Sequence, residues 1–400
     1  MNVIGIVCEY NPFHNGHLYH MQRSRELLGE DSPVICVMSG DFVQRGEAAI
    51  YSKFARAEAA CLSGADLVFE LPLPWSLSSA EGFARGAAGL LDRLGATHLC
   101  FGSETGETDP LETLARELLQ PGLQREVKEQ LARDGSLSYA AAREMAVRDR
   151  LGDLALLLEQ PNNILGVEYI KAIYDNRLHM EPCAVLRVGS GHDREGNASG
   201  FRAAAELRRL ISRGREIKGE LPETAEAVFA REKLQGRETA DKSAFEMAIL
   251  SRLRLFDEAC YEALPDAADG LGRRLYGAVR EEPSLDGVLA AAKTKRYALA
   301  RIRRVVMCAC LGVKAGMNEG IPPYARLLAA NCRGRELLRD LQRDSKVPIL
   351  TKPAAVKNMG RLCAELFTLG ANAHDFYTLG YRAVEERKPG KDWRTGPKIV

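Results

Sequence analysis

The first half of the chain alternates short apolar runs with longer segments in which apolar residues recur at helical spacing. Five strands are predicted from the apolar runs at residues 3–8, 34–38, 66–71, 98–101 and 182–188. Helices are predicted between them at residues 18–28, 52–62, 78–94 and 164–174, with two more helical segments between 111 and 147. Such alternation is typical of an α/β fold, a parallel sheet covered by helices on both faces. These sheets bind ligands at the carboxyl ends of their strands, where strand order reverses.

The hydrophobic spacing changes after residue 200, where helical segments dominate. They are predicted at residues 202–212, 222–230, 243–255 and 291–310, together with one short strand candidate at 347–350. The basic tail at residues 388–400 is predicted to be loose. Because 400 residues exceed what one core usually holds, we predict a first domain at residues 1–200 and a mainly helical region at 201–400, with a softer boundary near 270.

The composition is that of a globular protein, with 46% hydrophobic and 27% charged residues. No apolar run reaches the roughly 18 residues of a membrane helix, and no basic region precedes the first apolar stretch as in a signal peptide. The ten cysteines include no C-x-x-C pair, which favours reduced thiols over disulfides or a zinc site. We therefore predict a cytoplasmic protein with no membrane segment and no protein-bound metal.

The net charge of +1 conceals an uneven distribution. Residues 271–400 contain 25 Lys and Arg against 12 Asp and Glu, a net charge of +13, whereas the first 270 residues carry −12. A basic region of this size is typical of a protein that binds a polyanion. An Arg-rich, solvated helical surface fits the composition equally well.

The stretch "CEYNPFHNGHLYHM", residues 8–21, follows the first predicted strand and leads into the first helix. Its three histidines, His14, His17 and His20, fit three alternatives: metal ligands, core residues or a nucleotide site. Metal ligands need a rigid scaffold and a further carboxylate or thiolate, whereas Pro12 and Gly16 place His14 in a loop. Core histidines would be unusual in so polar a loop.

The nucleotide interpretation uses the strand end, the turn and the start of the helix together. Free N–H groups and the positive end of the helix dipole would face an anion there. The imidazoles of His14 and His17 would donate hydrogen bonds to phosphate oxygens as negative charge develops at the α-phosphorus. Gly16 would let the backbone approach the ligand closely. We therefore favour a nucleotide site over a metal site, and expect His20 to be a helix-face residue.

The sequence "NPFHNGH" resembles the H-x-G-H signature of the nucleotidyltransferase superfamily. The segments "GIVCEYNPFHNGHLYH", "VMSGDFVQRGE", "GADLVFELP", "FGSETG" and "PNNILGVEY", in this order, are similar to the bacterial tRNA(Met) cytidine acetate ligase family over residues 1–205. The resemblance implies a Rossmann-like (HUP-type) nucleotidyltransferase domain. It also implies that ATP activates acetate to acetyl-adenylate, which then acetylates the wobble cytidine of elongator tRNA(Met) to N4-acetylcytidine. Mg²⁺ is expected to accompany ATP through its phosphates.

The resemblance also implies a set of site residues, with His14 and His17 as the catalytic pair. The ATP-binding residues that it implies are Val7, Cys8, Glu9, Tyr10, Asn11, Pro12, Phe13, His14, Asn15, Gly16, His17, Leu18, Tyr19, His20, Gly102, Asn162, Arg187, Ser199 and Arg202. Ser199 and Arg202 match the second phosphate motif of the superfamily in "NASGFR", although Gly200 and Phe201 depart from it and leave the role of Ser199 open.

Several of these positions have structural alternatives. Gly102 fits a tight turn as well as a nucleotide contact. Asn162 and Asn163 fit a cap of the helix predicted at residues 164–174, and Asn162 is preferred for ATP. Arg187 interrupts an apolar run. Because burial of an unpaired guanidinium is costly, its side chain is expected either to face a cleft or to form a buried ion pair.

Other polar residues extend the candidate site. Gln44, Arg45 and Glu47 in the loop at residues 40–47 fit contacts to acetate, triphosphate or tRNA, and fit an ordinary surface loop equally well. Lys53 and Arg56, one helical turn apart, are expected to extend a basic rim. The residues predicted to contact tRNA phosphates are Arg301, Arg303, Arg304 and Lys314.

Two other functions remain open at this stage. A small-molecule adenylyltransferase of nucleotide-cofactor synthesis would keep the H-x-G-H chemistry but would not explain the basic region. An RNA-binding protein that senses ATP without turnover would lose only nucleotide affinity when His14 is replaced. The acetate pocket has no recognisable pattern, so the acyl donor and the tRNA rest on the resemblance alone.

Overall fold

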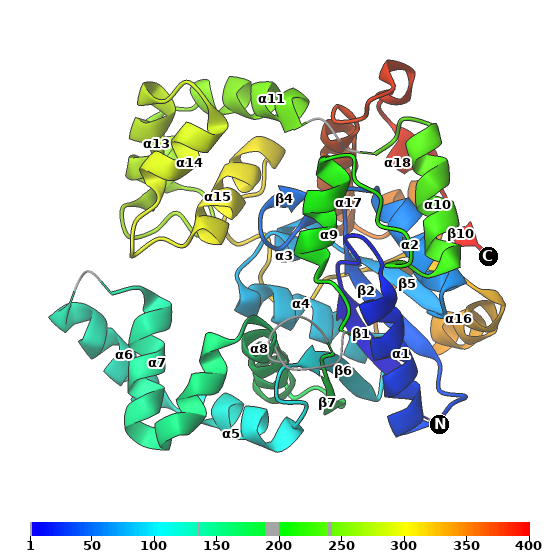
Figure 1. The fold of residues 1–400 in the computed structure, drawn as a ribbon, viewed down its shortest axis with the longest axis horizontal. Coiled ribbons are helices and arrows are strands. Elements are labelled where there is room, and N and C mark those ends of the chain that lie inside the picture. The colour runs from blue at the N-terminus through cyan, green and yellow to red at the C-terminus, as the bar shows by residue number, and fades with distance from the viewer. Residues whose placement is uncertain (1, 135–136, 189–199, 239–241) are drawn as a thin grey trace.

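The computed structural model describes residues 2–134, 137–188, 200–238 and 242–400 and contains one large, mostly parallel sheet (Figure 1). Five parallel strands lie side by side in the order β5-β2-β1-β6-β7. Their bounds are β1 Ile4–Cys8, β2 Val34–Ser39, β5 Leu67–Leu71, β6 His98–Ser103 and β7 Glu181–Leu186. The five predicted strands and the α/β fold class are therefore confirmed. Strand order reverses between β1 and β6, which places the ligand site at their carboxyl ends.

Helices cover both faces of this sheet, as the alternating pattern predicts. The helices that follow β1, β2, β5 and β6 along the chain are α1 Asn15–Leu28, α2 Lys53–Leu62, α4 Ala80–Arg93 and α8 Pro161–Asp175. One buried cluster joins Ile35 and Val37 of β2 to α4 and α8. Another joins Val34 and Cys36 of the same strand to α1 and α2. Successive β2 residues thus face opposite cores, which explains why buried parallel strands read as continuous apolar runs.

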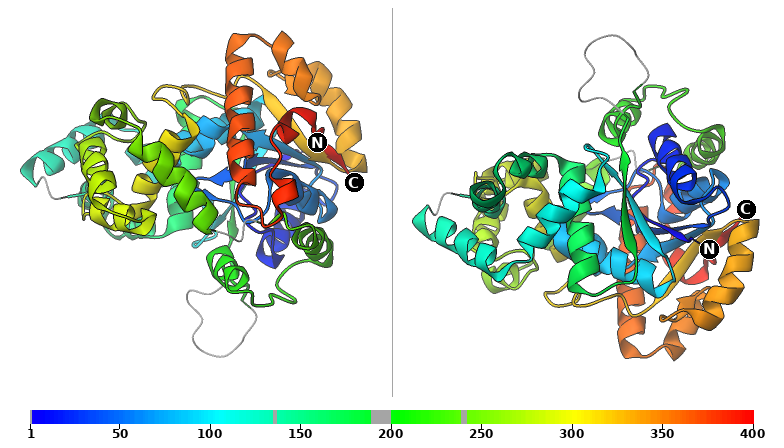
Figure 2. Two further views of the ribbon diagram at one scale, coloured as in Figure 1. Left: turned by 90° about the horizontal axis from the view of Figure 1, so that it is seen from above. Right: turned by 90° about the horizontal axis from the view of Figure 1, so that it is seen from below.

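Two helical arms project from the same side of the sheet (Figures 1 and 2). The first lies between β6 and α8 and contains α5 Thr108–Leu118, α6 Pro121–Arg133, α7 Tyr139–Leu151 and the 3₁₀ helix η1 Gly152–Glu159. The second contains α11 Lys242–Arg254, α12 Glu258–Glu262, α13 Leu271–Glu281, α14 Leu285–Ala292 and α15 Leu299–Leu311. Among the described residues, no helix is long and apolar enough to cross a membrane. All ten cysteines are free thiols.

The C-terminal region returns to the sheet; the strand candidate at residues 347–350 is confirmed as β9, whereas β8 and β10 were not predicted. Strand β8 Ala325–Ala330 pairs antiparallel with β5, and β9 Ile349–Leu350 and β10 Lys398–Ile399 pair parallel with β8. Helices α16 Cys332–Asp344 and α17 Arg361–Thr378 connect these strands, with short α18 Lys391–Arg394 before β10. The sheet thus contains residues from both sides of the division predicted near residue 200. A short apolar run such as "ARLLAA" has no periodicity that separates strand from helix, which is why β8 was missed.

The tail predicted to be loose is held by a buried network of charges. Lys53 of α2 is 1% exposed, and its Nζ lies 2.8 Å from Glu70 Oε1 and 2.9 Å from Asp392 Oδ2. Arg326 Nη1 lies 2.8 Å from the same Asp392 oxygen. Burial alone would raise the pKa of Asp392, but Lys53 and Arg326 hold it well below its usual range. Both the loose tail and the placement of Lys53 on an exposed basic rim are therefore wrong.

We predict that Asp392→Ala will lower the free energy of unfolding by about 3–5 kcal/mol, because it removes one of the two carboxylates shared by the buried Lys53 and Arg326 and leaves Glu70 alone to pair with both cations. Thermal denaturation of the purified variant measures this loss. Arg343→Ala is the matched control, since it removes exposed ion pairs on α16 and should leave the melting temperature near that of the parent. Equal melting temperatures for the two variants would contradict the structural role of the network.

Candidate active site

The H-x-G-H motif forms the junction between β1 and α1, and both of its histidines are fixed by the backbone. His14 is the N-cap of α1, and its Nδ1 accepts the N–H of Gly16 at 3.0 Å. The N–H of His14 in turn donates to Nδ1 of His17 at 3.2 Å. The two rings lie 3.8 Å apart between centroids. Because both Nδ1 atoms accept hydrogen bonds, each neutral ring carries its proton on Nε2 and offers that N–H to a ligand.

Both imidazoles are neutral near pH 7. Burial lowers the pKa of His14 to about 4, with smaller contributions from the positive charges of Arg187 and Arg208. The pKa of His17 is lowered well below its usual value by burial, by His14 and by Arg187. Two neutral donors side by side can bind phosphate oxygens without proton transfer.

The first-turn amides of α1 are already occupied, contrary to the prediction that they are free. The N–H of Asn15 donates to the carbonyl of Glu220 at 3.0 Å, and the N–H of His17 donates to the carbonyl of His14 at 2.8 Å. The N–H of Gly16 donates to the imidazole of His14. An anion at this helix end therefore interacts with the imidazoles and the helix dipole rather than with these amides.

Gly16 is required for a reason that differs from the predicted one. A Cβ at this position would lie 2.8 Å from Cε1 of His14, closer than side chains pack. The glycine therefore makes room for the imidazole that caps its own helix.

Gly102 and Arg187 lie together at the carboxyl ends of β6 and β7. The N–H of Arg187 donates to the carbonyl of Ser103 at 2.9 Å, and its Nη1 donates to Oδ1 of Asn162 at 3.1 Å. A Cβ at Gly102 would lie 3.1 Å from Cγ of Arg187, so the glycine leaves space for this side chain. Arg187 is exposed and forms no ion pair with a described carboxylate, which excludes the buried ion pair within the described chain.

The two asparagines of α8 have different surroundings. The Glu104 carboxylate caps the helix, accepting the N–H of Asn162 at 3.2 Å and that of Asn163 at 2.8 Å. Asn163 is fully buried, and its Oδ1 accepts the hydroxyl of Ser103 at 2.9 Å. Asn162 instead contacts Arg187, on the side of the histidine pair. Neither asparagine is the cap that the sequence suggested, and Asn162 remains the one predicted to contact ATP.

The motif loop is held by two arginines whose roles the sequence did not reveal. Arg56 of α2 is fully buried, so its placement on a basic rim is wrong. It donates to the carbonyls of Glu9, Ser39 and Gly40, which end β1 and β2. Arg208 Nη1 donates to the carbonyl of Asn11 at 2.9 Å. An arginine in a helical pattern gives no sign that it will bind carbonyls from a distant loop, so no sequence signal distinguishes these two.

Other residues of the motif segment pack against the histidine pair or fix the neighbouring loop. The Tyr10 ring lies 4.8 Å from Phe13 and 4.9 Å from His17, between centroids. The Glu9 carboxylate accepts the N–H of Gln44 at 2.7 Å, and burial raises its pKa. Residues 7–20 thus run from the end of β1 into α1, and their contact with ATP stays a prediction.

His20 lies closer to the site than its expected place on a helix face suggests. Its Nε2 is buried and has no hydrogen-bond partner within the described chain. Burial, followed by the charge of Arg187, lowers the pKa of His20 to about 4.

The second phosphate motif is only partly visible. Ser199 lies outside the described residues. Arg202 is exposed, with Nε 3.0 Å from Glu220 and Nη1 3.9 Å from Glu206. Phe201 packs on Tyr19 of α1 with ring centroids 5.7 Å apart, which places this segment beside the motif.

The basic residues predicted to contact tRNA are mostly engaged within the protein. Arg303 pairs with Glu47, and Arg304 is buried, with Nη2 3.1 Å from Asp266. Arg301 Nε donates to the Asp266 carbonyl at 2.8 Å. Lys314 is the exposed member of the group.

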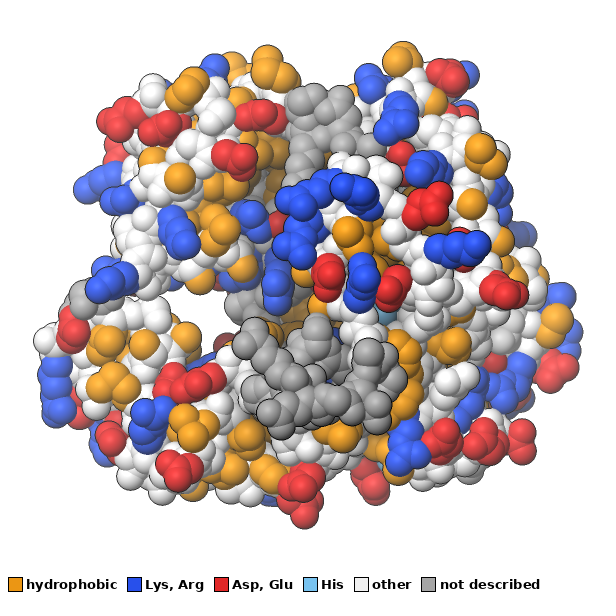
Figure 3. All heavy atoms as spheres, in the orientation of Figure 1, with side chains coloured by type: hydrophobic (Ala, Val, Ile, Leu, Met, Phe, Trp, Pro, Cys, Tyr) orange, Lys and Arg blue, Asp and Glu red, His pale blue; other side chains and the backbone are white. Residues whose placement is uncertain are grey.

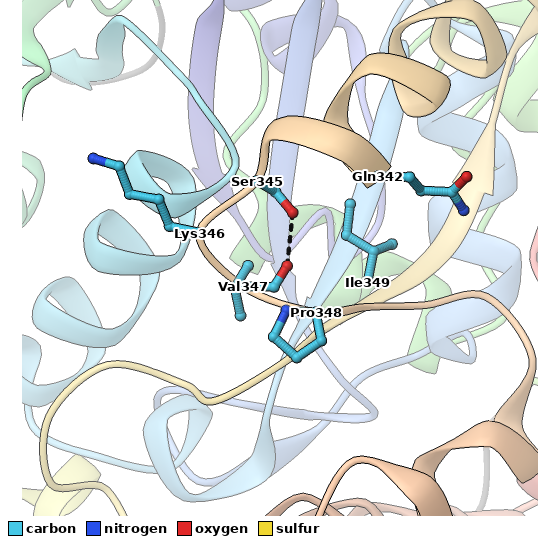
Figure 4. Close-up of a pocket in the computed structure, with 6 residues that line it drawn as sticks. All are labelled: Gln342, Ser345, Lys346, Val347, Pro348 and Ile349. Carbon is cyan, nitrogen blue, oxygen red and sulfur yellow. Dashed lines mark hydrogen bonds between the residues drawn. The ribbon is translucent and has the colours of Figure 1, made fainter.

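A hollow of about 410 Å³ lies at the turn between α16 and β9 and shares no residue with the motif (Figure 4). Its lining includes Lys346, Pro348 and Ile349. A second hollow of about 560 Å³ lies between Lys233 and Glu386. Both are shallow surface features, so the candidate site rests on the motif chemistry. Within the described residues, no three His, Cys, Asp or Glu side chains are grouped to hold a metal ion.

We predict that Arg187→Gln will raise the pKa of His14 and His20, because it removes a positive charge that disfavours their protonation. Both values should stay below 6.5, since burial still disfavours the charged ring. NMR titration of the imidazole signals measures the change, with Arg343→Gln on distant α16 as the control. Unchanged values in Arg187→Gln would show that the guanidinium does not face the motif.

Comparisons with known proteins identify the family of this chain. The chain matches the family model described as HIGH Nucleotidyl Transferase over residues 1–392. It is 34% identical over 420 residues to the tRNA(Met) cytidine acetate ligase of Fervidobacterium nodosum, with 98% of each chain covered. It is 38% identical over 358 residues to that of Caldicellulosiruptor saccharolyticus, covering 88% of this chain and 87% of the relative.

Solved structures give the same assignment. The crystal structure of Thermotoga maritima TmcAL bound with alpha-thio ATP covers 100% of both chains at 33% identity, with a TM-score of 0.92. The apo form of that protein gives a TM-score of 0.94 at 32% identity, again over 100% of both chains. Since the family model and the relatives cover nearly the whole sequence, this chain belongs to the tRNA(Met) cytidine acetate ligase family of HIGH nucleotidyl transferases.

Proposed function

We propose that this protein is an ATP-dependent ligase that acetylates the wobble cytidine of elongator tRNA(Met) to N4-acetylcytidine. The single observation that supports this most directly is the pair of neutral imidazoles at the carboxyl end of β1, in a chain of this family. Acetate, ATP and tRNA are the substrates, and Mg²⁺ enters bound to the phosphates of ATP.

In the first step, an acetate oxygen attacks the α-phosphorus of ATP. A new P–O bond forms as the bond to pyrophosphate breaks, which gives acetyl-adenylate and pyrophosphate. The Nε2–H groups of His14 and His17 donate to phosphate oxygens as negative charge develops on them. Because both rings are neutral and fixed by backbone hydrogen bonds, little reorganisation is needed at the moment of attack.

Arg187 and Arg202 are the arginines proposed to supply positive charge to the triphosphate. Arg187 lies at the end of β7 with its guanidinium directed by Asn162, and both residues belong to the proposed ATP contacts. Arg202 reaches the triphosphate only if it leaves its exposed ion pairs with Glu206 and Glu220, which are individually weak.

In the second step, the exocyclic amine of cytidine attacks the acetyl carbonyl. The new C–N bond forms as the C–O bond to AMP breaks, and the amine proton is released to solvent or to the leaving phosphate. This step joins a cytoplasmic tRNA to an intermediate held at the motif, so the proposal includes a cytoplasmic location.

The direct test is to incubate the purified protein with ATP, labelled acetate and unmodified tRNA, then to digest the tRNA and identify acetylated cytidine by mass. We predict that His17→Ala will lower the rate about 10²–10³-fold, since it removes one donor to the developing charge. His17→Gln should retain more activity, because its amide N–H reaches about as far as Nε2.

His179→Ala is the matched control. His179 is exposed, binds Asp92 and precedes β7, so it lies at the amino ends of the strands, whereas the motif lies at their carboxyl ends. It should leave acetylation unchanged. Release of pyrophosphate without label in tRNA would mean that the acceptor is wrong, and a small-molecule adenylyltransferase would then be favoured. Full activity of His17→Ala would contradict the assignment of the site.

A further inference from the structure

Among the described residues, exposed cations without an ion-pair partner lie beside the motif on α9 Ala204–Ser212 and on the residues that follow it. Acidic partners such as Asp266 and Glu47 neutralise the arginines of α15. Within residues 204–218, the exposed basic residues that form no ion pair with a described residue are Arg209, Arg213, Arg215 and Lys218. Figure 3 shows Lys and Arg side chains gathered in the region where Figure 1 draws α9.

This basic segment is attached to the motif at two points. At one end, Arg208 Nη1 donates to the carbonyl of Asn11 at 2.9 Å. At the other, Asn15 donates its side-chain amide to the carbonyl of Gly219 at 2.8 Å and its backbone N–H to that of Glu220 at 3.0 Å. The buried side chain of Leu207, next to Arg208, holds the helix against the core at the first of these points. A ligand bound along the segment is therefore kept at a fixed place relative to His14.

Positive charge continues inward from the segment to the histidine pair. Arg45 is exposed, and the pKa of Arg208 is lowered by burial, with a smaller contribution from the positive charge of Arg45. Arg208 and Arg187 both lower the pKa of His14. Positive charge thus extends from the exposed face of α9 to Arg208, which contacts Asn11 in the motif loop, and several cations in one region fit a nucleic-acid backbone with several phosphates better than one small anion.

We propose that the exposed basic face of residues 204–218 binds the phosphate backbone of the tRNA substrate and delivers the target cytidine to the histidine pair. This inference rests on the proposed function. Phosphate contacts carry no sequence information, so the face supplies affinity and register rather than the choice of base.

The test compares Arg209→Gln/Arg213→Gln with the parent in two assays. In the first, tRNA affinity is measured by filter binding over a series of salt concentrations. The variant should bind about tenfold more weakly, and the slope of log affinity against log salt should fall by about 1–2, as for the loss of two phosphate contacts. In the second, acetate-dependent exchange of pyrophosphate into ATP, without tRNA, should be unchanged.

Arg335→Gln/Arg339→Gln is the matched control, because these two residues are exposed and one turn apart on α16, away from α9 (Figures 1 and 2). It should leave both assays unchanged. If the control variant bound tRNA as weakly as the α9 variant, the loss of affinity would be a general effect of net charge, and the proposal would be overturned. Melting temperatures near that of the parent verify that both variants are folded.

The two assays also distinguish binding of the tRNA backbone from binding of the triphosphate of ATP. A raised KM for ATP in exchange, with tRNA affinity intact, would assign the segment to the triphosphate and overturn the proposal. Unchanged tRNA binding with normal exchange would contradict the assignment of residues 204–218 as the tRNA-binding surface, and would leave the proposed function in place. A parent protein that binds tRNA through this face but performs no acetate-dependent exchange would instead contradict the proposed function alone.

Discussion

The hydrogen bonds that two imidazoles accept from the backbone at the start of α1 are the constraint on which the site depends. They fix the proton of each neutral ring on Nε2, and burial keeps both rings neutral near pH 7. Hydrogen bonds within the protein also occupy the amides of Asn15, Gly16 and His17, so the groups that this helix end offers to an anion are the imidazoles of His14 and His17. The local sequence therefore replaces the backbone amides of a helix N-terminus with two oriented donors, the Nε2–H groups of His14 and His17.

The orientation of this pair depends on residues far away in the sequence. Arg56 joins the ends of β1 and β2 through their carbonyls, and a buried guanidinium is stable there because several acceptors satisfy it. One helical turn away, Lys53 connects α2 to Asp392 and so to the last strand of the sheet. The C-terminal segment thus stabilises the scaffold of the motif although none of its residues was predicted to touch ATP.

The sequence predicted those parts of the fold that local pattern determines. Five strands, the helices between them and the H-x-G-H loop follow from apolar periodicity and from residue types near the strand ends. Strand β8 and the ordered tail were missed because their stability comes from pairing with β5 and from Asp392 meeting Lys53 and Arg326. The surroundings of Asn162 could have been anticipated, since Glu104 follows the end of β6 in "FGSETG", at the same sheet edge.

The count of charges along the chain predicted a basic region, but it did not predict which cations are exposed and available to bind an anion. Much of the +13 at residues 271–400 is paired with acids of the first 270 residues: Arg303 pairs with Glu47, and Arg333 binds Asp66 through two hydrogen bonds. Such pairs attract a polyanion weakly, because each cation would have to give up a carboxylate first. Arg209 and Arg213 carry less total charge but have no described partner to lose. The free energy available for binding RNA therefore depends on unpaired charge near the motif, which only the folded arrangement reveals.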